Sequence, residues 1–85
     1  MSPSPHLDDR IIARRRVVGE RIRQARIRAN LSQESVGLRS GIDRASYNRI
    51  EQGHASPLLD TLFRIADAIG VSTSELVRED STPHS

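Results

Sequence analysis

Arginine and asparagine side chains gather on one side of a short segment near the middle of the chain. Residues 44–49 read RASYNR, and Tyr47 forms an inward i, i+3 pair with Ile50. The positions that then face outward are Arg44, Ala45, Asn48 and Arg49. Guanidinium groups form paired hydrogen bonds to phosphate and to guanine O6 and N7 better than lysine does. The spacing therefore indicates a helix face that binds a nucleic acid.

Local signals place this segment in the second of two short helices. Ser32 has a hydroxyl that can cap a helix over residues 33–40, and Gly41 can take the left-handed conformation that ends it. Asp43 can cap a second helix over about residues 43–52. Two short helices joined by so tight a turn form a helix-turn-helix, which makes binding to double-stranded DNA the leading function.

Three further helices are predicted around these two. Apolar spacing predicts a long first helix from about residue 9 to 29 and a fourth helix that ends at Gly70, while Ser72 and Glu75 form a capping box for a fifth. The inward residues are Ile11, Val18, Ile22, Ala25 and Ala29 in the first, Leu59, Leu62, Ile65, Ala66 and Ile69 in the fourth, and Leu76 and Val77 in the last. The chain of 85 residues has room for one core, so we expect a single all-α domain over residues 9–80 with flexible tails at 1–8 and 81–85.

Five motifs follow one another between about residues 19 and 77: GERIRQAR, LSQ, GI, RIEQG and LFRIADAIGVS. Their order and spacing resemble the Cro and phage-repressor-like helix-turn-helix proteins, also called the XRE family. The resemblance implies a compact five-helix bundle of the lambda-repressor-like type. Three positions depart from the family's usual pattern: Gly37 replaces a small residue that is commonly alanine, Tyr47 replaces a branched aliphatic residue, and Leu58 replaces Ser or Thr. The glycine is expected to cost about 1 kcal/mol of helix stability relative to alanine.

The resemblance also implies a set of DNA contacts. In the family the N-terminal part of the second motif helix faces the major groove, where arginine would read guanine, asparagine adenine, and an alanine methyl group the thymine methyl. The base-reading residues are then Arg44, Ala45, Asn48 and Arg49. The expected phosphate contacts are Gln33, Ser46, Gln52 and His54, and loss of Gln33 should weaken all sequences alike. Arg15 and Arg16 are added to them from the arginine run of the first helix rather than from the resemblance. Family members commonly pair the positions that here are Arg26 and Glu51, which would tie the first helix to the reading helix.

Positive charge is concentrated in the first half of the chain. Residues 10–49 carry eleven arginines and three acidic residues, a net charge of +8, whereas residues 50–85 carry two arginines and six acidic residues, a net charge of −4. The run formed by Arg10 and residues 14–16 either contacts phosphate or is an ordinary solvated face. All thirteen basic residues are arginine, which suits DNA contacts and also fits the coding bias of a GC-rich genome. Both explanations stay open.

Composition and motifs disfavour several other classes of protein. The chain has no cysteine, and its three scattered histidines lack ligand spacing, so no disulfide, metal site or cofactor is expected. An enzyme is not expected, because Asp43, Ser46 and His54 lie within one helix and its edges rather than around a pocket. Single-stranded RNA is disfavoured because Tyr47 and Phe63, which could stack bases, are expected in the core. No apolar run is long enough for a signal sequence or a membrane span, so we expect a cytoplasmic protein, nucleoid-associated when bound to DNA.

A homodimer is expected because one reading helix covers only a few base pairs. Two copies would bind an inverted repeat whose half-site centres lie about 34 Å apart. The acidic second half, with the fourth and fifth helices, is the face left for a twofold contact. Its apolar candidates are Leu58, Val71, Leu76 and Val77. A rival apolar strip in the first helix consists of Ile12, Val17 and Ile27.

Two kinds of function remain open from the sequence. The first is a transcriptional regulator, most simply a repressor or autoregulator that occupies a promoter. The second is an antitoxin or a restriction-modification controller protein whose role includes binding a protein partner, which the sequence does not identify. Genetic context separates them, because a neighbouring toxin-like gene or restriction-modification pair would favour the second.

Overall fold

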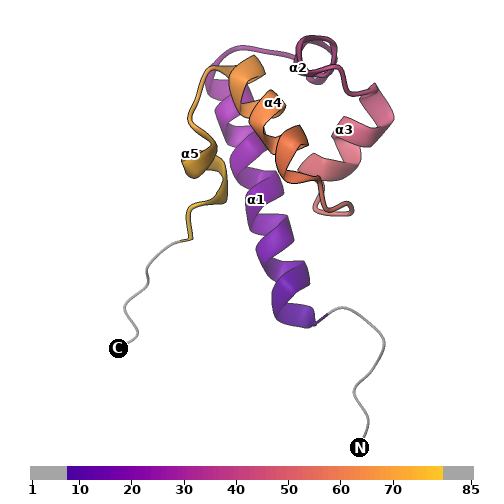
Figure 1. Cartoon of the computed structure of the whole chain (residues 1–85), viewed down its shortest axis with the longest axis vertical. Coiled ribbons are helices and arrows are strands. Elements are labelled where there is room, and N and C mark those ends of the chain that lie inside the picture. Colours follow the sequence, from indigo (N-terminus) through magenta and orange to yellow (C-terminus); the bar gives the residue numbers. More distant parts are fainter. Residues whose placement is uncertain (1–7, 80–85) are drawn as a thin grey trace, which may run out of the picture.

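Five α-helices make up the regular structure of residues 8–79, the part of the chain that this computed structural model describes (Figure 1). The helices are α1 (Asp9–Arg28), α2 (Gln33–Ser40), α3 (Arg44–Glu51), α4 (Leu59–Ile69) and α5 (Thr73–Val77). No strand occurs within the described residues, which confirms the all-α prediction. Residues 1–7 and 81–85, which make up most of the two predicted tails, lie outside the described residues, as does residue 80. Asp8 belongs to the helical domain, because its side chain caps α1 through the backbone N–H of Arg10.

Polar caps and left-handed residues mark the helix ends where the sequence predicts them. Ser32, Asp43 and Ser72 precede α2, α3 and α5, and each side chain accepts a hydrogen bond from the backbone N–H three residues later. Asn30 and Gly41, after α1 and α2, have φ angles of 59° and 76°, in the left-handed region that closes a helix. The turn between α2 and α3 therefore spans only residues 41–43.

The helix α1 supports the rest of the fold. It packs against α3 and α5, while α2 packs against α3 and α4, and α4 against α5. The first turns of α1 extend past the other helices (Figure 1). The buried apolar residues are Ile22, Ala25, Val36, Tyr47, Ile50, Ile65, Ala66, Ile69 and Leu76. This single core fixes α3 at one side of the molecule.

Five residues that the sequence places in the core lie at the surface. Ile11 is 45% exposed because the start of α1 extends past its neighbours, and Ala29 is exposed because it follows the last turn of that helix. Leu59 and Phe63 lie on a different side of α4 from its buried residues and are 61% and 45% exposed. Val77, at the end of α5, is 40% exposed. The periodicity identified the helices but not the full width of their buried faces.

The three departures from the family pattern have distinct structural consequences. Tyr47 is fully buried, and Leu58 stands at the N-cap of α4 without any side-chain hydrogen bond to it. A Cβ atom added to Gly37 would lie 2.7 Å from the carbonyl oxygen of Ile42, closer than real Cβ contacts come. Alanine at position 37 would therefore gain helix propensity but clash, because the backbone of the turn occupies the space of a methyl group.

Candidate nucleic-acid interface

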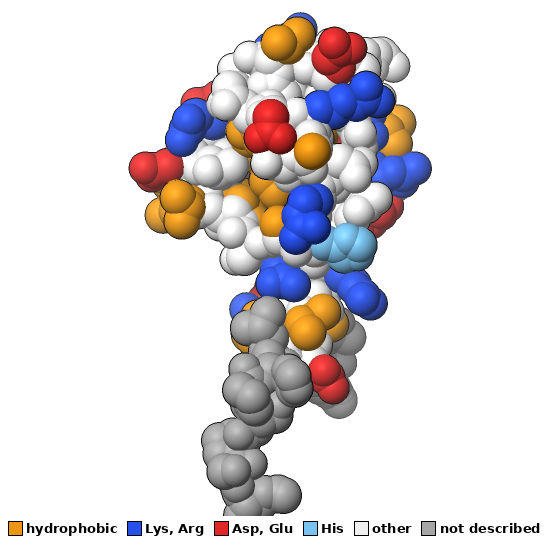
Figure 2. Space-filling view, turned by 90° about the vertical axis from the view of Figure 1, so that its right-hand side faces the viewer, with side chains coloured by type: hydrophobic (Ala, Val, Ile, Leu, Met, Phe, Trp, Pro, Cys, Tyr) orange, Lys and Arg blue, Asp and Glu red, His pale blue; other side chains and the backbone are white. Residues whose placement is uncertain are grey.

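The helix α3 presents a polar face opposite its buried side. Tyr47 and Ile50 point into the core, as the sequence predicts. The residues Arg44, Ala45, Ser46 and Arg49 are exposed, and Asn48 is half-buried. Figure 2 views the molecule from the right-hand side of Figure 1, where α3 lies, and shows arginine side chains at several points on this face. The face therefore combines positive charge with hydrogen-bond donors.

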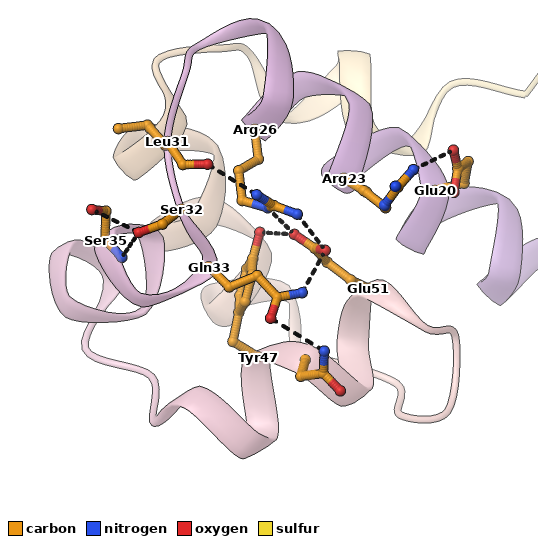
Figure 3. A network of polar contacts seen from close by, with 10 residues as sticks. Glu20, Arg23, Arg26, Leu31, Ser32, Gln33, Ser35, Tyr47 and Glu51 are labelled. Atoms are coloured by element: carbon orange, nitrogen blue, oxygen red, sulfur yellow. Dashed lines mark hydrogen bonds and ion pairs between the residues drawn. The ribbon is translucent and has the colours of Figure 1, made fainter.

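A bidentate ion pair joins α1 to the C-terminal end of α3 (Figure 3). The Nε and Nη2 atoms of Arg26 donate to the two carboxylate oxygens of Glu51, at 2.6 Å and 3.2 Å. The Tyr47 hydroxyl donates to the same carboxylate, and Arg26 Nη1 donates to the carbonyl oxygen of Leu31 at 2.9 Å. The side chains of the pair are only 14% and 3% exposed. Water therefore has little access, and each charge depends on its partner.

The surroundings of this pair stabilise its charged form. Burial alone raises the pKa of the Glu51 carboxyl, but hydrogen bonds from Arg26, Tyr47 and Gln33 lower it more, so its pKa lies below the ordinary value. The hydrogen bond to Glu51 raises the pKa of Arg26, and burial raises that of the Tyr47 hydroxyl. At neutral pH the carboxylate and the guanidinium group are ionised and the tyrosine is neutral.

Gln33 and Asn48 lie next to this pair and contact each other. Gln33 Nε2 donates to Glu51 Oε1 at 3.0 Å, and Gln33 Oε1 accepts a hydrogen bond from Asn48 Nδ2 at 3.2 Å (Figure 3). The side chain of Gln33, predicted to contact phosphate, is thus directed towards α3. Asn48, predicted to point fully outward, is half-buried because it reaches back to α2.

Ser46 lies in the first turn of α3 beside the cap. Its backbone N–H donates to the Asp43 carboxylate at 3.0 Å. Hydrogen bonds from the side chain and the backbone of Ser46 lower the pKa of Asp43. Ser46 is exposed, at the end of α3 that carries the positive pole of the helix dipole.

Two arginines of α1 lie beside the loop that follows α3. Arg15 Nε donates to the carbonyl oxygen of Gly53 at 3.0 Å. Gly53 has a φ angle of 78°, and a Cβ atom there would lie 2.6 Å from Cγ of Arg16, so only glycine fits this approach. Arg49 Nη2 donates to the carbonyl oxygen of His54 at 3.1 Å. Four predicted phosphate contacts, namely Arg15, Arg16, Gln52 and His54, are thus in or beside one loop.

The arginine run of α1 divides into two parts. Arg14 forms an ion pair with Glu79, and Arg10 lies 3.5 Å from a carboxylate oxygen of Asp8. Both side chains are exposed and lie beside acidic groups of this chain. Arg15 contacts the loop after α3 instead.

Gly19 makes the close approach of α1 and α3 possible, and the sequence reasoning assigned it no role. A Cβ atom on this buried glycine would lie 2.5 Å from the carbonyl oxygen of Glu51 and 2.6 Å from that of Ile50. A glycine inside a long amphipathic helix costs helix stability, so it signals a packing requirement when it falls on the buried face. That signal was present in the sequence.

Within residues 8–79 no three His, Asp or Glu side chains are grouped so that they could hold a metal ion. None of the described helices is both long and apolar enough to cross a membrane. His6 and His84 lie outside the described residues.

A short helix with an exposed arginine-bearing face, held across a tight turn by a second helix, defines a helix-turn-helix DNA-binding domain. Residues 22–76 match the family model HTH_3, described as helix-turn-helix. The chain belongs to this family, which confirms the resemblance to the Cro and phage-repressor-like proteins.

Relatives and solved structures agree with this assignment. The chain is 39% identical over 70 residues to the uncharacterised HTH-type transcriptional regulator y4dJ of Sinorhizobium fredii, covering 81% of this chain and 91% of that protein. It is 36% identical over 62 residues to the CTXphi transcriptional repressor RstR of Vibrio cholerae, covering 73% of this chain and 56% of that protein. The fold is similar to the restriction-modification controller protein C.AhdI of Aeromonas hydrophila, with a TM-score of 0.74 and 31% identity, covering 75% of this chain and 97% of that one.

Proposed function

We propose that this protein is a transcriptional regulator that binds a specific double-stranded DNA sequence with α3 in the major groove. The observation that carries the proposal is the exposed face of α3, where Arg44 and Arg49 stand beside polar and small residues while the opposite face is fixed in the core. The names of its relatives, a transcriptional regulator and a phage repressor, support the same function. A repressor or autoregulator that occupies its own promoter is the simplest form.

The proposed contacts fall into two groups. Arg44 and Arg49 would read guanine, Asn48 adenine, and the Ala45 methyl group a thymine methyl. Phosphate contacts would come from Ser46, Gln52, His54, Arg15, Arg16 and the first turn of α2 at Gln33. The backbone N–H groups at that helix start attract an anion whatever the base sequence.

Selection of bound sequences by the wild-type protein and by Arg49→Ala tests the assignment of base readers. The variant should lose about 1–3 kcal/mol of binding free energy and relax preference at one base pair. Arg16→Ala serves as the matched control, because loss of a phosphate contact weakens all sequences alike and reduces the salt dependence. Identical sequence profiles for Arg49→Ala and wild type, with affinity merely lower, would make Arg49 a phosphate contact.

We further propose a homodimer formed through α4 and α5. Val71 and Leu76, two of the sequence candidates, belong to the core or pack against it. The apolar residues exposed on these helices and at the N-cap of α4 are Leu58, Leu59, Phe63 and Val77. Leu59 and Phe63 stand four residues apart on one side of α4, where they support a twofold contact.

Sedimentation at tens of micromolar tests this interface with two matched variants. Phe63→Glu should convert the dimer to a monomer, because it places a charge in the apolar contact. Ile27→Glu, on the rival strip of α1, should leave the dimer intact, since Ile27 is equally exposed at 44%. A wild-type monomer that binds an inverted repeat one to one would contradict the dimer, and dissociation by Ile27→Glu alone would move the interface to α1.

A controller protein of a restriction-modification system is the second candidate. The observation that favours it is the 31% identity to C.AhdI across nearly the whole of that chain. Such a protein would use the same α3 face, so DNA binding does not separate the two roles. Restriction and modification genes beside the gene for this chain would favour the controller.

A further inference from the structure

We propose that Gln33 is a positioning residue for base recognition: its side-chain amide transfers the fixed orientation of the Glu51 carboxylate to Asn48. Asn48 then presents one acceptor and one donor to the major groove. The proposal rests on the proposed function, in which Asn48 reads a base.

The contacts form a continuous chain from the core to the surface (Figure 3). Glu51, with its side chain 3% exposed, accepts a hydrogen bond from Gln33 Nε2 at 3.0 Å. Gln33, half-buried at the start of α2, accepts one from Asn48 Nδ2 at 3.2 Å through Oε1. This series of hydrogen bonds thus connects a fixed buried charge to a side chain on the polar face of α3.

Each group in this chain sets the direction of the next. A carboxylate can only accept hydrogen bonds, and Arg26 and Tyr47 already hold the Glu51 carboxylate in place. Gln33 must therefore turn its nitrogen towards Glu51, which leaves its oxygen towards Asn48. An amide oxygen also only accepts, so Asn48 must turn its own nitrogen inward. If the Asn48 amide were reversed, its Oδ1 would face Gln33 Oε1, with no hydrogen between the two acceptors.

The fixed orientation has a consequence for sequence preference. An asparagine amide carries two N–H groups and one oxygen, and one N–H is committed to Gln33. The remaining N–H and Oδ1 match the N7 acceptor and the N6 donor of adenine. Gln33 therefore contributes to adenine preference at one base pair, in addition to the uniform effect that the sequence alone predicts for it.

Gln33→Met tests this relay, the hydrogen-bonded series from Glu51 through Gln33 to Asn48. The substitution keeps the length of the side chain and its helix propensity while removing both hydrogen bonds of Gln33. Gln24→Met is the matched control, since Gln24 also donates to a glutamate but on the exposed side of α1. Binding-site selection with both variants, with Asn48→Ala and with Gln33→Met/Asn48→Ala measures preference at each base pair. NMR of the DNA-free protein follows the Asn48 side-chain amide resonances, and thermal melting identifies variants that fail to fold.

Gln33→Met should reduce adenine preference roughly two- to tenfold at the base pair that Asn48→Ala affects, the cost of ordering one side chain. It should also shift the Asn48 amide resonances towards those of free asparagine, and the double variant should show the same preference as Asn48→Ala. Gln24→Met should change none of these. If Asn48→Ala relaxes one base pair and folded Gln33→Met does not, the relay is wrong and base reading by Asn48 stands. If Asn48→Ala leaves every preference unchanged, both the relay and the reader assignment are wrong.

Discussion

Replacing Glu51 by glutamine should strongly destabilise the domain. Glutamine keeps the size and shape of the side chain but removes the negative charge and places an N–H donor next to other donors. In the wild type the carboxylate accepts hydrogen bonds from Arg26, Tyr47 and Gln33. The variant leaves the guanidinium group of Arg26 without its counterion, next to α3 and only 14% exposed.

The magnitude follows from how deeply the pair is buried. Breaking a buried ion pair by removing one partner costs about 3–5 kcal/mol, because a charge is left uncompensated. Arg26 keeps its hydrogen bond to the carbonyl oxygen of Leu31 and some access to water, so we expect the lower end, about 3 kcal/mol. For a domain of this size that loss corresponds to a melting temperature lower by roughly 12–24 °C.

Thermal and urea unfolding followed by circular dichroism measure this effect. Glu20→Gln is the matched control, because Glu20 receives the same substitution in an exposed pair, 3.5 Å from Arg23. The control should change the free energy of unfolding by less than about 1 kcal/mol. An unchanged melting temperature for Glu51→Gln would refute the reasoning, since the pair would then contribute nothing to stability.

The same variant has a distinct pH dependence. The pKa of Glu51 is lowered in the folded state, so its stabilising effect is present above the pKa of the unfolded chain, about 4.3, and is lost as the pH falls through the folded value. The difference in stability between wild type and Glu51→Gln should therefore be constant near neutral pH and shrink below about pH 4. A difference that stays constant into strong acid would contradict this account.

Two further substitutions test packing and capping. Gly19→Ala should destabilise by about 1–3 kcal/mol in urea unfolding, although alanine favours a helix, because its Cβ atom would lie 2.5 Å from the Glu51 carbonyl oxygen; an unchanged or raised midpoint would mean that α1 and α3 separate freely. Leu58→Ser should stabilise by about 0.5–2 kcal/mol, because it supplies the hydroxyl that the N-cap of α4 lacks. Since Leu58 is 74% exposed, the substitution removes little buried apolar area. A lower melting temperature for Leu58→Ser, measured in the Phe63→Glu variant that is expected to be monomeric, would show that the Leu58 side chain packs.

Local backbone chemistry made most helix boundaries predictable from the sequence. Ser32, Asp43 and Ser72 act as caps through hydrogen bonds that span only three residues, so neighbours in the chain determine them. The turn at Gly41 likewise depends on one residue that can adopt a positive φ angle. These signals predicted the two motif helices, and the apolar periodicity predicted the scaffold helices to within about one residue.

Contacts between distant residues were not predictable in the same way. Arg15 contacts Gly53 across 38 positions and Asn48 contacts Gln33 across 15, and no local pattern connects them. The exposure of Phe63 was missed because periodicity shows which stripe of a helix is apolar, whereas the neighbouring helices decide how much of it is covered. The Arg26–Glu51 pair was expected only through the family resemblance.

The rotation of α3 about its own axis determines where its exposed side chains point, and apolar packing alone fixes this rotation weakly. This helix of eight residues has only Tyr47 and Ile50 as buried apolar anchors, and hydrophobic contact has no preferred direction. The two hydrogen bonds between Arg26 and Glu51 are directional, and they act at the C-terminal end of α3. A buried ion pair often stabilises no more than apolar residues of similar volume. Its distinctive contribution here is therefore directional: the two hydrogen bonds restrain the rotation of α3, and with it the direction in which Arg44 and Arg49 point.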